Sequence, residues 1–248
     1  NYIYIKTLGN HFKIISGRKI NVAVVGCGRI SKNHIKSIVL HHNSFNLIAF
    51  CDNSPEKLKQ AQNSFNEANK TKDIKNVPPR EFTDYKEMLK STNSGEIKID
   101  LIVLATPSGF HSEQVIESAK AGIHVCTEKP MATKWSDGLA MVEACEKANV
   151  RLFVVKQNRF NSTIKLVKNQ LNANRFGKLS IVNVNVFWQR PQAYYDQDKW
   201  RGTYELDGGA LMNQASHYVD LLDWLIGPVE SLNASIATIS RRIEVEDT

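Results

Sequence analysis

The chain has 248 residues, of which 42% are hydrophobic and 23% are charged, a balance typical of globular proteins and not of disordered ones. Its formal net charge is +7, from 32 basic and 25 acidic side chains, and no run of five or six basic residues concentrates that charge. Scattered basic residues indicate solvated faces, so we expect no nucleic-acid partner. No apolar run approaches the roughly 18 residues of a membrane span, so we expect no membrane partner either.

The four cysteines, Cys27, Cys51, Cys126 and Cys145, are widely spaced and form no Cys-x-x-Cys pair. We therefore predict no metal site, reduced thiols that act as small hydrophobic side chains, and a cytoplasmic location. No signal peptide is evident. Residues 1–19 contain no motif, and we treat them as an N-terminal extension of unknown role.

From residue 20 onward, short apolar runs alternate with helical patterns. Strands are predicted at 20–25, 47–51, 101–105, 123–126 and 151–155, and helices at 30–40, from Pro55 onward, at 81–91, 112–121 and 135–148. Polar residues 63–80 are predicted to form a surface excursion. This alternation predicts an α/β fold, a doubly wound parallel Rossmann sheet that binds a dinucleotide, over residues 20–157.

The pattern changes after residue 158. Predicted here are helices at 163–171 and 213–226 and strands at 179–188 and 229–240, the first strand with clear period-two alternation. They predict an α+β domain over residues 158–248, with helices on one side of a sheet. Because a two-stranded sheet is only marginally stable, we expect this domain to be incomplete.

A glycine turn, Gly26-Cys27-Gly28-Arg29-Ile30-Ser31, follows the first strand and opens a helix. Gly26 permits a tight turn, Gly28 lets the backbone approach a pyrophosphate, and the helix N-terminus offers N–H groups to phosphate oxygens. A plain structural turn is the alternative interpretation. In this strand–turn–helix context we predict dinucleotide binding.

Asp52 ends the second strand, where its carboxylate can accept hydrogen bonds from a ribose. A carboxylate at this place repels a 2′-phosphate, which favours NAD over NADP. The alternative is an Asp that caps the helix beginning at Pro55.

Thr106-Pro107 ends the third strand, at the sheet edge where such folds bind ligands, and His111 follows it. A histidine of this kind is either a site residue or a structural hydrogen-bonding group.

Glu128-Lys129-Pro130 ends the fourth strand, where an ammonium would stabilise a developing alkoxide. His217 lies in a predicted helix, four residues after Asn213 and therefore on the same face. Histidine titrates near neutrality and suits general-base work. A surface lysine and a buried structural histidine are the alternatives.

Together these features resemble the glucose–fructose oxidoreductase/inositol dehydrogenase superfamily. The resemblance depends on the glycine turn, Thr106-Pro107, Glu128-Lys129-Pro130, Trp200-Arg201, Gly208-Gly209 and Asn213-x-x-x-His217. Segments 155–159, 187–191 and 212–220 further resemble the UDP-N-acetylglucosaminuronate 3-dehydrogenases. One departure is Asn213, where many superfamily members carry Asp, so His217 is expected to be less basic than in an Asp–His pair.

The resemblance implies a homo-oligomer, a dimer or tetramer, that oxidises the C3 hydroxyl of a nucleotide sugar with NAD, for surface polysaccharide synthesis. It also implies that residues 158–248 form an open-sheet domain for substrate binding and oligomer contacts. It implies Lys129 and His217 as catalytic residues and Lys129, Arg159, Arg190, Asn213 and His217 as substrate contacts. Its implied cofactor contacts are Gly26, Gly28, Arg29, Ile30, Asp52, Thr106, Pro107, His111, Glu128, Lys129, Gln157, Trp200 and Arg201. A dehydrogenase of another sugar or of inositol, and a cofactor-sensing regulator without turnover, remain the alternatives.

Overall fold

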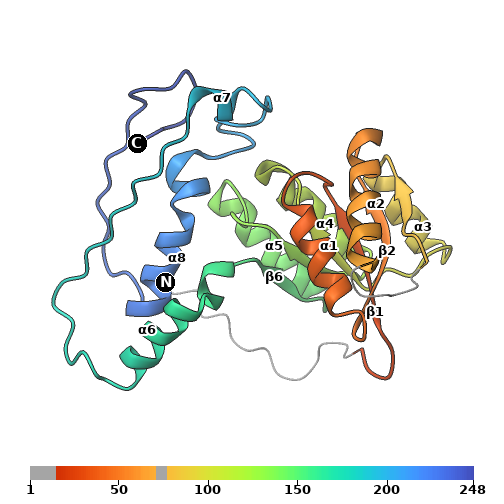
Figure 1. Ribbon diagram of the computed structural model, residues 1–248, viewed down its shortest axis with the longest axis horizontal. Helices are drawn as coiled ribbons and strands as arrows, with labels where there is room; N and C mark the ends of the chain where they lie inside the picture. Colours follow the sequence, from red (N-terminus) through yellow and green to blue (C-terminus); the bar gives the residue numbers. More distant parts are fainter. Residues whose placement is uncertain (1–14, 71–76) are drawn as a thin grey trace. The chain divides into compact units, whose positions relative to one another are not determined.

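Six strands form one sheet in the computed structural model, which describes residues 15–70 and 77–248. In chain order they are β1 (Ile20–Val25), β2 (Phe45–Cys51), β3 (Arg80–Phe82), β4 (Leu101–Leu104), β5 (His124–Thr127) and β6 (Leu152–Val154). Their order across the sheet is β3-β2-β1-β4-β5-β6, and β1 pairs in parallel with both β2 and β4 (Figure 1). Because the strand order reverses between β1 and β4, a crevice at their carboxyl ends is the expected ligand site. The predicted Rossmann sheet is confirmed.

Helices that follow the strands complete this part of the chain: α1 (Ser31–Leu40), α2 (Pro55–Lys70), α3 (Tyr85–Asn93), α4 (His111–Lys120) and α5 (Trp135–Lys147), with a short 3₁₀ turn, η1 (Ser108–Phe110). Helices α1 and α2 contact each other, as do α4 and α5. One core cluster joins alternate residues of β1, such as Val22 and Val24, to Ile35 of α1 and Phe65 of α2. Alternation along β1 therefore places every second side chain under α1 and α2.

Two predictions in this part were wrong. Residues 63–70 belong to α2 and not to a surface excursion, because Leu58, Ala61 and Phe65 continue one buried helical stripe. Residues 71–76 of the predicted excursion lie outside the described residues. The helix predicted at 81–91 begins later, at Tyr85, because Asp84 caps it by accepting from the Glu87 N–H. Glu81 and Phe82 instead belong to β3, which pairs with β2.

All four cysteines are free thiols. Burial raises the pKa of Cys51 to about 12 and that of both Cys126 and Cys145 to about 11, and it raises the pKa of Cys27 as well. Thiols with raised pKa values are poor nucleophiles at neutral pH. These cysteines act as small hydrophobic side chains in the fold, as predicted.

The chain divides into two compact units. The first covers residues 15–106, 110–128 and 134–153 of the described chain, and the second covers 107–109, 129–133 and 154–248. The second contains η2 (Gln157–Phe160), α6 (Ser162–Asn172), α7 (Gln192–Tyr195), the π-helical turn η3 (Ala210–Gln214) and α8 (Ser216–Ile226). Lys129, at the end of the fourth-strand motif, thus lies in the same unit as His217.

Neither strand predicted for the second unit is formed. Residues 179–188 and 229–240 are extended loops, and no strand occurs between residues 155 and 248, all of which the structure describes. Their apolar side chains are largely exposed: Ile181 is 88% exposed, Phe187 91% and Leu232 84%. Period-two alternation marks a strand only where another element covers the apolar face and neighbouring strands take the backbone hydrogen bonds. Such partners are missing for both segments within the described residues.

Candidate active site

Gly26 holds the turn after β1 against the end of β4. Its φ is +85°, and a Cβ added there would stand 2.6 Å from the Ala105 carbonyl carbon and 2.7 Å from the Thr106 nitrogen. Both the left-handed backbone conformation and this close approach exclude any larger residue. The tight turn predicted for Gly26 is therefore present between the two strands that flank the crevice.

Gly28, two residues later, is needed for a different reason. A Cβ added there would meet no heavy atom of the described residues within 4 Å. Ser31 stabilises the turn, because its hydroxyl donates to the Gly28 carbonyl at 2.6 Å. The Arg29 side chain is exposed. Ile30 stands at the N-cap of α1, and no described side chain caps that helix end. A glycine that packing does not require, beside uncapped helix N–H groups, fits a pyrophosphate.

The Asp52 carboxylate is tied to the glycine turn. Its Oδ2 accepts from the Cys27 N–H at 2.8 Å, and its Oδ1 accepts from the Ser54 N–H at 2.9 Å. Ser54, not Asp52, lies next to the start of α2, where its hydroxyl accepts from the Lys57 N–H at 3.4 Å. Asp52 thus brings a negative charge to the turn. Each carboxylate oxygen retains acceptor capacity for a ribose hydroxyl.

His111 is fully buried at the start of α4. Its Nε2 lies 3.0 Å from the Thr106 carbonyl oxygen, and the Thr106 hydroxyl donates to Gln114 Oε1 at 2.6 Å. These contacts shape the loop that follows β4. His111 therefore supports the sheet edge, and contact of His111, Thr106 or Pro107 with a cofactor stays a prediction.

Glu128 has a partner that the sequence analysis missed. His34 Nε2 lies 2.8 Å from Glu128 Oε1, and both side chains are mostly buried. His34 is three residues after Ser31, so both residues lie on the same face of α1. Ser31 is the residue whose hydroxyl donates to the Gly28 carbonyl in the glycine turn. The three-residue spacing from Ser31 to His34 was the sequence feature that could have predicted a role for His34 near the glycine turn. The pair joins the first turn of α1 to the end of β5.

Lys129 is held by Asn213 in the second unit. Its Nζ donates to the Asn213 side-chain Oδ1 at 2.9 Å and to the Asn213 backbone oxygen at 3.0 Å. The Asn213 amide nitrogen in turn donates to Asp207 Oδ1, and Asp207 Oδ2 accepts from the Gly202 N–H at 2.7 Å. Two segments far apart in sequence thus meet at one ammonium. No pattern in the sequence indicated Asp207 as part of this chain of hydrogen bonds.

His217 is buried in the first turn of α8, with its ring edge-on to Trp188 at a centroid distance of 6.4 Å. The helix predicted over 213–226 is interrupted, because the Ala215 N–H donates to the Ala210 oxygen and closes a π turn that contains Asn213. The same-face argument for Asn213 and His217 assumed one continuous α-helix, so it stays a prediction. The residues remain connected, since the Ser216 hydroxyl donates to the Asn213 oxygen that also accepts from Lys129.

The predicted arginines are engaged to different degrees. Arg159 forms a two-point ion pair with Asp220, at 2.8 and 2.6 Å, and hydrogen bonding to Asp220 raises the pKa of the guanidinium. Arg190 stacks over the rings of Trp188 and Tyr194, and its buried Nε has no hydrogen-bond partner among the described residues. Arg190 is therefore the better placed of the two to receive an added anion.

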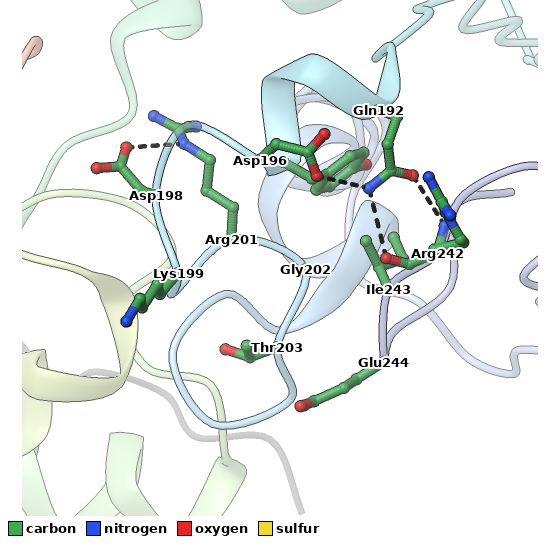
Figure 2. Close-up of a pocket in the computed structure, with 11 residues that line it drawn as sticks. Gln192, Asp196, Asp198, Lys199, Arg201, Gly202, Thr203, Arg242, Ile243 and Glu244 are labelled. Carbon is green, nitrogen blue, oxygen red and sulfur yellow. Dashed lines mark hydrogen bonds and ion pairs between the residues drawn. The ribbon is translucent and has the colours of Figure 1, made fainter.

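Trp200 and Arg201 form a stack of their own. The guanidinium of Arg201 lies 4.8 Å from the Trp200 ring and 4.3 Å from the Tyr194 ring, and its Nε donates to Asp198 at 3.0 Å. Figure 2 shows Arg201 and Asp198 among the residues that line a hollow. The volume of this hollow is about 380 Å³. The charged residues lining it are Lys199, Arg201, Arg242, Asp196, Asp198 and Glu244. With three charges of each sign, this hollow does not by itself favour an anion. Cofactor contacts by Trp200, Arg201 and the exposed Gln157 stay predictions.

Neither a metal-binding cluster nor a membrane-spanning helix occurs among residues 15–70 and 77–248. No group of three or more His, Cys, Asp and Glu side chains there is arranged to hold a metal ion. Within the same residues, every helix is too short or too polar to cross a bilayer.

Solved structures resemble this chain over nearly its whole length. The WlbA dehydrogenase from Bordetella pertussis, in complex with NADH and UDP-GlcNAcA, is 54% identical, with a TM-score of 0.83 over 93% of this chain and 65% of that one. The WlbA dehydrogenase from Chromobacterium violaceum, with the same two ligands, is 52% identical, with a TM-score of 0.84 over 94% of this chain and 63% of that one.

Among curated relatives, the D-apiose dehydrogenase of Paraburkholderia graminis is 26% identical over 93% of this chain and 56% of its own length. The chain thus spans less than two thirds of each of these three proteins. The family model for an oxidoreductase family with an NAD-binding Rossmann fold matches residues 20–156, and the GFO/IDH/MocA C-terminal domain model matches residues 164–248. Since these two models together cover most of its length, the chain belongs to the GFO/IDH/MocA oxidoreductase family.

Proposed function

We propose that this protein is an NAD-dependent dehydrogenase that oxidises the C3 hydroxyl of UDP-N-acetylglucosaminuronate (UDP-GlcNAcA) to the 3-keto sugar, as a step towards a surface polysaccharide. The observation that carries the proposal is the meeting of Lys129 with Asn213, four residues before His217. Its substrate is inferred from the two WlbA dehydrogenases, which share 54% and 52% identity with the chain and were solved with NADH and UDP-GlcNAcA.

The reaction breaks one C–H bond and one O–H bond and forms a C=O bond. NAD, when bound, supplies the hydride acceptor. His217 accepts the hydroxyl proton as general base. Lys129 donates a hydrogen bond to the same oxygen and stabilises the negative charge that develops on it. Arg190, with Arg159 and Asn213 as further contacts, holds the anionic groups of the substrate.

The residues of the first unit fit NAD. Gly28 and the uncapped N-terminus of α1 would receive the pyrophosphate. Asp52 would accept hydrogen bonds from the adenosine ribose and repel a 2′-phosphate. We therefore expect faster reduction of NAD than of NADP at equal concentrations.

The direct test is NADH formation, followed by its absorbance, with UDP-GlcNAcA compared with free sugars and inositol as substrates. Lys129→Ala and His217→Ala are each expected to lower kcat by about 100-fold or more, because each removes a group that acts on the reacting oxygen. NADH affinity should change little. Lys147→Ala and His41→Ala, two exposed side chains of the first unit, are the matched controls.

Unchanged turnover in the Lys129 and His217 variants would refute the catalytic assignment. Turnover of inositol or a free sugar, without turnover of UDP-GlcNAcA, would refute the proposed substrate. NADH binding without turnover of any compound in the panel would indicate a cofactor-sensing regulator instead.

A further inference from the structure

We propose that Asp207 is a positioning residue for this reaction: it sets the orientation of the Asn213 amide and thereby aims the ammonium of Lys129. The proposal rests on the function proposed above for Lys129. Asp207 itself need not touch the substrate, since it acts through Asn213.

The buried carboxylate of Asp207 can only accept hydrogen bonds. The residue is 1% exposed, and its Oδ2 accepts from the Gly202 N–H at 2.7 Å. Its other oxygen accepts from the Asn213 side chain. An ionised carboxylate has no hydrogen to donate, so Asn213 must turn its NH₂ group toward Asp207. The amide oxygen of Asn213 is thereby directed the other way.

The ammonium of Lys129 lies on that other side. Asn213 provides two acceptors for it, the side-chain Oδ1 at 2.9 Å and the backbone oxygen at 3.0 Å. If the amide were reversed, its NH₂ group would face the ammonium, two donors would oppose each other, and one of the two bonds would be lost. Asp207 is the group that makes the reversed orientation unfavourable.

The local backbone explains how Asp207 and Asn213 come together. The Asp207 and Gly208 N–H groups both donate to the Thr203 oxygen, which closes a tight loop. Gly208 and Gly209 follow with φ values of +87° and +95°, conformations that favour glycine. The π turn η3 then brings Asn213 back toward Asp207. The buried carboxylate at the end of this loop accepts one hydrogen bond on each oxygen, and both bonds belong to this chain.

Asp207→Asn tests the proposal with almost no change in volume. The amide introduced at position 207 can accept from the Gly202 N–H only by turning its own NH₂ group toward Asn213. Asn213 must then reverse, and Lys129 loses its side-chain acceptor. We expect kcat to fall by about tenfold or more, with KM and NADH affinity within about twofold of wild type.

The double variant Asp207→Asn/Asn213→Asp separates positioning from a merely structural role. The amide at position 207 again accepts from Gly202 and donates to position 213, where a carboxylate now accepts both from that amide and from Lys129. Each donor of the chain again faces an acceptor, with only the bond between positions 207 and 213 reversed in direction, so kcat should recover most of the loss. Asp196→Asn, an exposed carboxylate that accepts from Gln192, is the control and should behave as wild type.

A second measurement does not depend on turnover. Trace acetylation of the native protein with acetic anhydride, followed by mass spectrometry, reports the reactivity of the Lys129 amine. In Asp207→Asn this rate should rise by about fivefold, the factor expected for loss of one hydrogen bond, and it should return toward wild type in the double variant.

The outcomes separate the two proposals. Wild-type protein without turnover of any sugar would refute the proposed function, while the labelling rates would still decide the role of Asp207. Wild-type kcat and labelling in Asp207→Asn would overturn the positioning role. A folded double variant, checked by circular dichroism, that stays as slow as Asp207→Asn would overturn it as well.

Discussion

At the level of single residues, Gly26 and Gly28 occupy the same turn under different constraints. Gly26 is required by the protein itself, because its Cβ would collide with the backbone of Ala105 and Thr106. Gly28 has no positive φ, and its Cβ would meet no heavy atom of the described residues within 4 Å. Packing therefore explains the first glycine, and ligand approach explains the second.

Gly28→Ala separates folding from cofactor binding. The free energy of unfolding should stay the same or rise by up to about 1 kcal/mol, because alanine restricts the unfolded chain. NADH affinity, measured by isothermal titration calorimetry, should fall by about tenfold or more, because the methyl group stands where the pyrophosphate would approach. Gly26→Ala should instead impair folding. Wild-type NADH affinity in Gly28→Ala would contradict this assignment of the glycine turn.

At the level of elements, α2 illustrates how a buried stripe outweighs a polar composition. Residues 63–70 are mostly polar, with three Asn, one Glu and one Lys, yet Phe65 is only 1% exposed and meets Phe50 of β2 edge-on at 6.4 Å. The last two turns of α2 are therefore fixed by contact with the sheet. The π turn η3 likewise depends on distant partners, since the Glu246 side chain accepts from the Leu211 N–H at 2.9 Å.

Phe65→Ala should lower the free energy of unfolding of the first unit by about 3–5 kcal/mol, the cost of removing a buried aromatic side chain. Urea unfolding followed by circular dichroism measures it. Glu67→Ala, on the exposed face of α2, is the control and should stay within about 0.5 kcal/mol of wild type. Similar values for both variants would mean that this end of α2 does not contribute to the core.

At the level of the whole molecule, Arg18 and Asp100 join the segment before β1 to the loop before β4. Arg18 donates to both Asp100 oxygens, at 2.6 and 2.7 Å, and the Asn21 N–H donates to Asp100 at 2.8 Å. Burial alone would raise the pKa of Asp100, but the hydrogen bonds from Arg18 and Asn21 outweigh it and lower the pKa. A carboxyl group with a lowered pKa in the folded state stabilises that state while it is ionised.

The resulting pH dependence can be measured. The stability from Asp100 should be fully present above its unfolded pKa of about 4 and be lost as the pH falls through its lower folded value. The difference in unfolding free energy between wild type and Asp100→Asn should therefore be constant from about pH 7 to about pH 5 and shrink below about pH 4. Glu67→Gln, an exposed side chain, serves as control. A difference that grows on acidification would reverse the assigned sign.

Other properties of the whole molecule stay predictions. A homo-oligomer, dimer or tetramer, is still the expectation, and sedimentation equilibrium measures it directly. The cytoplasmic location and the role of residues 1–19, of which residues 1–14 lie outside the described residues, are likewise untested.

The Rossmann sheet followed from the sequence alone because its signals are local. Apolar runs of strand length, helical stripes and the glycine turn each occupy a few consecutive residues, and β1, α1 and α5 lie within one residue of their predicted bounds. Lys129 and His217 could be singled out in the same way, as chemically apt residues at a strand end and on a helix.

Only the tertiary structure decided which groups meet. Sequence spacing could not predict that Asn213 turns to Lys129 and Asp207, that His34 pairs with Glu128, or that Asp220 occupies Arg159. Nor could it decide whether residues 179–188 and 229–240 become strands. Each of these outcomes depends on partners far away in the chain, and a pattern of neighbouring residues contains no information on which distant hydrogen-bond donor, acceptor or apolar face will be there.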